Sequence, residues 1–291
     1  MKPPRFDYHD PETVPEVVGL LKTLPNARML AGGQSLMPML NMRLALPDHL
    51  VDLNRVEGLA YIRETGGALE IGAMTRQRDI EFSQLVLERC PVMHEAILQV
   101  GHRQTRNRGT LGGSLCQLDP SAELVAVAAA LEATIAVAGP KGTREIPFSG
   151  FPKTYMTPAI GPDELLTRVR FPLWPRPHGW AFVEFARRHG DFAVVSAVAL
   201  LEEDRGKIKR ASVTLGGVAA APVRMKEVEK ALVGQTASDA LFRDACEACR
   251  KIEAMQDVHA PASYRQHLAA VLSRRALERA HARTGAAKMS S

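Results

Sequence analysis

Apolar positions in the first quarter of the chain change between helical and strand spacing. Apolar residues from Val14 to Leu21 recur at intervals of three and four, which is typical of one face of a helix. The pattern predicts, in order, a helix from Val14 ended by Pro25-Asn26, a strand over Arg28–Ala31, a helix over Leu36–Leu44 and a strand over His49–Leu53. These segments predict a small βαβ-like unit over roughly residues 25–56.

The middle of the chain carries a second group of helical and strand patterns. The predicted elements are a strand over Leu69–Ala73, helices over 76–89 and 92–101, an alanine-rich helix over Ser121–Leu131, and strands over Thr134–Ala138, Glu145-Ile146 and Leu165–Phe171. Thr75 is expected to cap the first of these helices. The later strands predict a second sheet.

The best linker in the chain is Phe171–Gly179, which contains three prolines and a glycine. After it, β-branched residues around an Asp204-Arg205-Gly206 turn predict an antiparallel hairpin of Ala193–Leu201 and Ile208–Leu215. Three helices are then expected over 224–233, 238–255 and 261–284. The predicted domains are 1–175, with subdomains of about 1–56 and 57–175, and 176–285, followed by a frayed tail over 286–291.

Two glycine pairs about eighty residues apart are the main candidates for chemistry. They are Ala31-Gly32-Gly33-Gln34-Ser35 and Thr110-Leu111-Gly112-Gly113-Ser114. Each joins glycines, which allow close approach of backbone N–H groups, to a hydroxyl side chain. Either pair alone would indicate a tight turn, but together they suggest a split cradle for a pyrophosphate. Neither fits the usual dinucleotide or phosphate-loop fingerprints.

Composition and cysteine spacing exclude several other classes. With 46% hydrophobic residues the chain of 291 residues can bury sizeable cores, and its net charge of +5 is scattered, so nucleic-acid binding is not expected. No apolar run approaches the length of a membrane span, and the start of the chain does not read as a signal peptide, which favours a cytoplasmic protein. Cys246 and Cys249 follow a helical face, and the other two cysteines, Cys90 and Cys116, complete no iron–sulfur pattern.

Four segments resemble the flavin-binding medium subunit of molybdenum hydroxylases, the relatives of carbon monoxide dehydrogenase and xanthine dehydrogenase. The matching segments are 31–44, 106–123, 187–193 and 216–224. They stand in the family's order and spacing, and the resemblance covers nearly the whole chain. It implies an α+β fold: a two-subdomain FAD-binding domain of the PCMH type, which is similar to vanillyl-alcohol oxidase, and a smaller C-terminal α/β domain with an antiparallel sheet.

The resemblance implies that both glycine segments wrap the pyrophosphate of one non-covalently bound FAD. The residues that it assigns to the cofactor are Ala31, Gly32, Gly33, Gln34, Ser35, Leu36, Thr110, Gly112, Gly113, Ser114, Glu123, Leu166, Asp191 and Phe192. The N–H groups of Gly32–Ser35 and of Gly112-Gly113 are expected to face the phosphate oxygens. No catalytic residue and no metal ligand is expected in this chain.

Several residues near these segments have more than one possible role. Glu123 matches an acid that binds the ribose hydroxyls in the family, or it is an acid favoured by a helix N-terminus. Phe192 stacks on the isoalloxazine ring or belongs to the core. Glu184 stands where some members have a lysine near the flavin, and it is not assigned as a ligand. A basic cluster contacts phosphate, contacts partner subunits or is solvated, and its members are His102, Arg103, Arg106 and Arg108.

The implied function is electron transfer. In the family a large subunit with a molybdenum cofactor hydroxylates the substrate, a small subunit relays electrons through 2Fe–2S clusters, and the FAD of the medium subunit passes them to the final acceptor. The resemblance therefore implies both partner subunits and a dimer of heterotrimers. A stand-alone FAD-dependent oxidase or reductase is the alternative, although the chain offers no convincing general base for one. Neither the substrate nor the final electron acceptor follows from the sequence.

Overall fold

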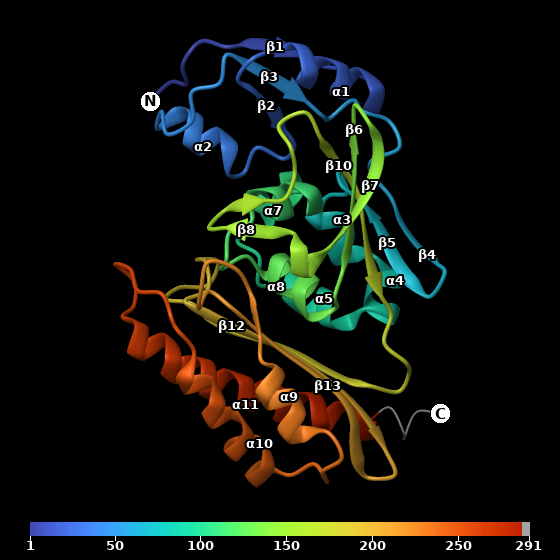
Figure 1. Ribbon diagram of the computed structural model, residues 1–291, viewed down its shortest axis with the longest axis vertical. Coiled ribbons are helices and arrows are strands. Elements are labelled where there is room, and N and C mark those ends of the chain that lie inside the picture. Colours follow the sequence, from blue (N-terminus) through green and yellow to red (C-terminus); the bar gives the residue numbers. More distant parts are fainter. Residues whose placement is uncertain (287–291) are drawn as a thin grey trace.

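The computed structural model describes residues 1–286, with side chains to residue 284, and consists of three parts stacked along its longest axis (Figure 1). The parts are built on sheets of three, five and four strands, and β8 (Pro152–Thr154) and β9 (Thr157–Pro158) form a small extra pair. No helix within the described residues is long and apolar enough to cross a membrane. Most of the predicted frayed tail, residues 287–291, lies outside the described residues.

The first part is a small parallel sheet with strand order β1-β3-β2. Its elements are β1 (Asp7–His9), α1 (Val14–Thr23), β2 (Ala27–Leu30), α2 (Leu36–Asn41) and β3 (His49–Asp52). Thr13 and Glu16 form a reciprocal capping box that starts α1. The predicted βαβ-like unit is therefore confirmed, but α2 is shorter than predicted because Arg43 adopts a left-handed conformation with φ of 58°.

The second part is an antiparallel sheet with strand order β4-β5-β10-β6-β7. The strands are β4 (Ile62–Thr65), β5 (Ala68–Gly72), β6 (Thr134–Gly139), β7 (Gly142–Pro147) and β10 (Leu165–Pro172). Every residue of β5 is buried, and α7 packs against this strand, while α1 packs near β6 and β10. The predicted second sheet is confirmed.

The helices of the second part are short. They are α3 (Gln77–Phe82), α4 (Gln84–Arg89), α5 (Pro91–Ile97), α6 (Arg103–Arg108), α7 (Leu111–Gln117) and α8 (Glu123–Ala130), with a 3-10 turn over Phe148–Gly150. The single helix predicted over 76–89 is wrong: Ser83 interrupts it and caps α4 by accepting a hydrogen bond from the N–H of Val86. Thr75 is not the expected cap, because its hydroxyl bonds to the backbone of Tyr61.

The third part is an antiparallel sheet with strand order β11-β12-β13-β14, covered on one face by a long helix (Figure 1). Its elements are β11 (Gly179–Phe185), β12 (Val195–Asp204), β13 (Lys207–Gly216), β14 (Val223–Arg224), α9 (Lys226–Leu232), α10 (Asp239–Cys246), a 3-10 turn over Glu247–Lys251 and α11 (Ala262–Ala286). The predicted hairpin is confirmed. The helix predicted over 238–255 is two shorter elements. The predicted boundary near residue 175 falls in the irregular stretch between β10 and β11, and the domain limits stay a prediction.

Both faces of the third sheet are buried, which fixes its place between two cores. Ala197 and Ala199 of β12 join the core under α11, whereas the alternating Val198 and Leu200 join the core of the second part. Successive side chains of a strand point to opposite faces, so from Ala197 to Leu201 each position of β12 supplies a residue to one of the two cores. The third part is thus packed directly against the second.

A charged cluster fastens α11 to the second part. Arg283 donates to both carboxylate oxygens of Glu95 on α5, at 2.7 and 3.0 Å, and to the carbonyl of Trp180 at 2.7 Å. The N–H of Phe182 donates to the same Glu95 carboxylate at 3.0 Å. Glu95 therefore binds both the edge strand and the last helix of the third part.

Replacing Arg283 with Met should lower the free energy of unfolding by roughly 1–3 kcal/mol, because the half-buried Glu95 carboxylate loses its bidentate partner. Urea denaturation measures this change. Arg243→Met is the matched control, since Arg243 makes one long, exposed ion pair with Asp244 and should change stability by less than about 0.5 kcal/mol. Equal stability of the Arg283 variant and the parent protein would contradict the role of this cluster.

Candidate functional site

The first glycine turn, Ala31–Ser35, joins β2 to α2 and leaves its backbone donors unused. Within the described residues, the N–H groups of Gly32, Gly33, Gln34, Ser35 and Leu36 donate no hydrogen bond to the protein. Ser35 stands at the N-cap of α2, yet its side chain makes no capping bond. Consecutive unpaired N–H groups in a turn form an anion-binding concavity.

Close packing holds this turn in place. A Cβ atom at Gly32 would overlap the carbonyl oxygen of Arg108, so only glycine allows the turn to lie against the end of α6. Gly33 has a φ of 73°, which side chains rarely adopt. Both glycines of the first pair are therefore required by geometry.

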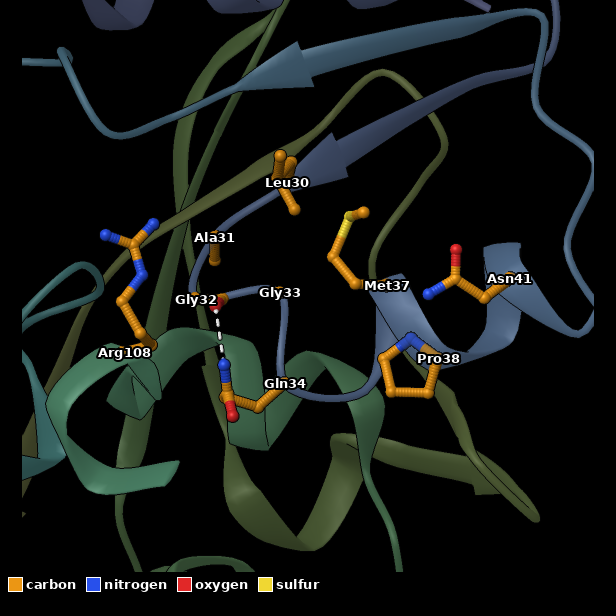
Figure 2. A pocket seen from close by; sticks show the side chains of 9 residues that line it. All are labelled: Leu30, Ala31, Gly32, Gly33, Gln34, Met37, Pro38, Asn41 and Arg108. Carbon is orange, nitrogen blue, oxygen red and sulfur yellow. Dashed lines mark hydrogen bonds between the residues drawn. The ribbon is translucent and has the colours of Figure 1, made fainter. Parts of the chain in front are cut away.

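A cavity of about 460 Å³ opens beside the turn (Figure 2). Its lining residues are Leu30, Ala31, Gly32, Gly33, Gln34, Met37, Pro38, Asn41 and Arg108. The side-chain amide of Gln34 donates to the carbonyl of Gly32 at 3.4 Å, and Figure 2 shows it below the turn. Unpaired N–H groups and a guanidinium beside one cavity suit an anionic ligand.

Two guanidinium groups lie next to the turn. Arg76 donates to the carbonyl of Arg108 at 2.6 Å and also to the side chain of Asn54. Burial and the positive charge of Arg108 lower the pKa of Arg76. Sequence reasoning missed Arg76, whose position just before α3 gives no phosphate signal.

The basic cluster predicted from the sequence divides into different roles. Arg106 is buried and paired with Glu81, with a further bond from its Nη1 to the carbonyl of Val100 at 2.9 Å. It is therefore committed to the protein interior. Of the four cluster residues, only Arg108 lines the cavity.

The second glycine pair lies beside the first, but its N–H groups are already used. The Cβ position of Gly113 is 3.5 Å from Cβ of Ala31, so the two segments meet. Thr110 caps α7 by accepting from the N–H of Gly113 at 3.0 Å, and the N–H of Gly112 donates to the carbonyl of Ala73 at 2.8 Å. The expectation that these two N–H groups face an anion is therefore wrong in this structure. The spacing of Thr110 and Gly113 fits an N-cap and its N3 residue, which was the available signal.

The remaining predicted residues lie farther along the second and third parts. Leu166 is 2% exposed and belongs to the core of the second part, so it does not line the cavity. Asp191 and Phe192 lie in the loop between β11 and β12, where the Phe192 ring is 61% exposed. Thr110, Ser114 and Leu36 flank the two glycine segments without appearing in the cavity lining.

Glu123 is the first residue of α8 and is only 4% exposed. Burial, together with the negative charges of Glu184 and Asp119, raises its pKa to about 8. Burial likewise raises the pKa of Glu184 to about 7. Two carboxyl groups with raised pKa values therefore lie near each other where the second and third parts meet.

Arg265, which sequence reasoning also missed, ties together two loops that the resemblance singled out. From α11, its buried guanidinium donates to the carbonyls of Val194 and Gly217, the latter at 2.6 Å, and to Asp257 at 2.7 Å. The N–H of Gly217 in turn donates to the carbonyl of Pro120 at 2.7 Å. One buried cation thus aligns the Phe192 loop with the segment that leads to α8.

Comparisons with known proteins match both halves of the chain. The model of the FAD binding domain in molybdopterin dehydrogenase matches residues 4–174, and that of the CO dehydrogenase flavoprotein C-terminal domain matches residues 180–280. The chain is 38% identical over 96% of both lengths to the 6-hydroxypseudooxynicotine dehydrogenase complex subunit alpha of Paenarthrobacter nicotinovorans. It is also 38% identical to the carbon monoxide dehydrogenase medium chain of Afipia carboxidovorans, over 97% of this chain and 99% of that one.

A solved structure agrees with these matches. Carbon monoxide dehydrogenase from Hydrogenophaga pseudoflava superposes with a TM-score of 0.94 at 36% identity, covering 97% of this chain and 99% of that one. Both domain types, their order and the fold agree, so the predicted fold class is confirmed. The chain belongs to the FAD-binding medium subunits of molybdenum hydroxylases, which are oxidoreductase complexes, and its cofactor is FAD.

Proposed function

We propose that this chain transfers electrons: its FAD passes them from the 2Fe–2S clusters of a small subunit to a final acceptor, while a large subunit with a molybdenum cofactor hydroxylates the substrate. The names of its relatives, a complex subunit and a medium chain, support an assembly with other chains. The solved carbon monoxide dehydrogenase is described as a form that lacks the Mo-pyranopterin moiety of the molybdenum cofactor. A dimer of heterotrimers in the cytoplasm is part of the proposal.

The observation that carries FAD binding is the run of unpaired N–H groups from Gly32 to Leu36 beside a cavity and two guanidinium groups. A pyrophosphate needs several donors and positive charge, and both are present. In the proposed site, Gly32–Leu36 bind the pyrophosphate oxygens, and Arg108 and Arg76 balance their charge. Gly112 and Gly113 contribute close packing rather than N–H donors.

The loop between β11 and β12 in the third part and the start of α8 in the second part supply the groups that would contact the rest of the cofactor. FAD supplies a ring that accepts electrons one at a time and releases them in pairs. Phe192 offers an exposed aromatic face from the loop that Arg265 positions. Asp191 lies beside it, and Glu123 lies at the start of α8, within the contact region between the second and third parts. We assign ring packing to Phe192 and a hydroxyl contact to Glu123.

Gly33→Val should weaken FAD binding by a factor of about 100 or more, or ~3 kcal/mol. Valine cannot easily hold the φ of 73°, so the run of N–H groups would lose its alignment. Isothermal titration of the cofactor-free protein with FAD measures the affinity, and the visible flavin absorbance of the purified variant gives the occupancy.

Gly58→Val is the matched control for backbone strain. Gly58 has a φ of 74°, and among the described residues other than its two chain neighbours no atom lies within 4 Å of its Cβ position. Both variants should lose similar stability, but only the Gly33 variant should lose FAD. Full FAD occupancy in a folded Gly33→Val protein would contradict the assignment of this turn.

Electron transfer is tested on the protein purified from its native source through an affinity tag on this chain. We expect two further subunits, one with a 2Fe–2S electron paramagnetic resonance signal and one that contains molybdenum. Rapid mixing of the FAD-loaded chain with the chemically reduced cluster subunit should bleach the flavin. The electron-transfer role is excluded if the cluster subunit never reduces this flavin, or if the chain purifies alone and its flavin is reduced directly by an organic substrate.

A further inference from the structure

The face of the third sheet that packs against the second part carries polar side chains at one end. Phe182 of β11 and Val198 of β12 belong to the core of the second part, and side chains on a strand alternate in direction. Glu184 and Ser196 are two residues from these apolar positions and therefore point to the same side. The polar positions thus face α8 and the segment before it.

These positions form one row across three strands, which we call the interface row. Glu184 pairs with Ser196, and Ser196 pairs with Gly216. A Cβ atom at Gly216 would overlap Oγ of Ser196 and would lie 3.3 Å from Cβ of Ala126 on α8. Glu123 is three residues before Ala126, so it lies on the same side of α8 and faces the row.

The interface row has polar atoms without partners. Oε2 of Glu184 and Oγ of Ser196 are buried and make no hydrogen bond among the described residues, and Ser196 is fully buried. Buried polar groups normally have a partner, so two unpaired atoms on neighbouring strands mark a place that a polar ligand or solvent group can fill. The carboxyl of Glu123, 4% exposed, faces the same space.

The surroundings of this space are acidic or neutral. The charges that act on Glu123 come from Glu184 and from Asp119, which precedes α8. β12 contributes a serine and β13 a glycine at the facing positions. Within the described residues, neither Glu123 nor Glu184 forms a salt bridge. With no cation of the described residues paired to either carboxylate, binding of a proton is the way to neutralise one of them.

The pair lies within reach of the proposed cofactor site along α7. Its N-cap, Thr110, lies beside the first glycine turn, and the helix ends at Gln117, two residues before Asp119. Its seven residues rise by about 10 Å. The carboxyl pair is thus about the length of one short helix away from the turn proposed to bind the pyrophosphate, a distance that one half of a dinucleotide can span.

We propose that Glu123 and Glu184 form a proton site that takes up one proton from solvent when the flavin is reduced. This inference rests on the proposed function. Two electrons from the partner's clusters and one proton convert the flavin to its singly protonated, anionic reduced form. That negative charge strengthens proton binding by the carboxylate, so a second proton converts one carboxylate to the acid. Reoxidation by the acceptor releases both protons.

Proton uptake is measured from the dependence of the flavin midpoint potential on pH. Between pH 7 and 8, the range of the two raised pKa values, the FAD-loaded wild-type protein should take up two protons for two electrons. Glu184→Gln and Glu123→Gln should each lower this number towards one. Glu227→Gln, the same change on the exposed face of α9, should leave it at two.

A second readout needs no flavin. The Glu123 carboxyl has a pKa of about 8 in the folded chain and an ordinary value of 4.5, so between these pH values it binds more protons in the folded than in the unfolded state. Its contribution to stability therefore falls as the pH rises from 4.5 to about 8. Glu123→Gln cannot titrate. The stability of the cofactor-free full-length variant should therefore rise relative to wild type between pH 5 and pH 8.

The outcomes separate this inference from the proposed function. Failure of the chain to bind FAD contradicts the proposed function, whatever the carboxyl groups do. The proton site is overturned if FAD binds and is reduced, but both Gln variants keep the proton number of the wild type. Retention of that number by Glu123→Gln alone would also overturn the shared role of the pair.

Discussion

Unpaired backbone amides after β2 are the feature on which the rest of the site depends. From Gly32 to Leu36 the chain offers N–H groups with no acceptor among residues 1–286, which is costly unless a ligand or solvent binds them. The turn keeps this form because Gly32 lies directly against the carbonyl of Arg108. The end of α6, the start of α7 and the cavity thus surround the backbone of Gly32–Leu36. The nearby guanidinium groups of Arg76 and Arg108 add positive charge beside it.

The third part of the fold fixes the position of a second group of residues, those around Phe192 and the start of α8. Arg265 is fully buried, and its guanidinium donates hydrogen bonds to the carbonyls of Val194 and Gly217. The N–H of Gly217 in turn donates to the carbonyl of Pro120, in the segment before α8. Burying a guanidinium is costly unless its donors find acceptors, so this arrangement fixes the loops around Phe192 relative to α8. The interface row lies within the same junction. Packing between the two parts therefore sets the environment of the carboxyl groups.

Local patterns predicted the elements well and the contacts poorly. The hairpin of β12 and β13 followed from its turn and β-branched residues, because both signals are local. The break at Ser83 was missed, since a single cap can divide a helical pattern. The second glycine pair was interpreted as a turn, although Thr110 uses it to begin a helix. Arg265 could not be found from sequence, because its acceptors lie far away along the chain.

Residue-resolved hydrogen exchange, with and without FAD, tests the central claim most directly. Amides that bind the pyrophosphate become protected on binding, whereas amides already bonded within the protein change little. FAD should slow exchange strongly at Gly32–Leu36, and Gly112 and Gly113 should be protected in both states. Unchanged exchange at Gly32–Leu36, together with new protection at Gly112 and Gly113, would contradict the claim that the first turn binds the pyrophosphate.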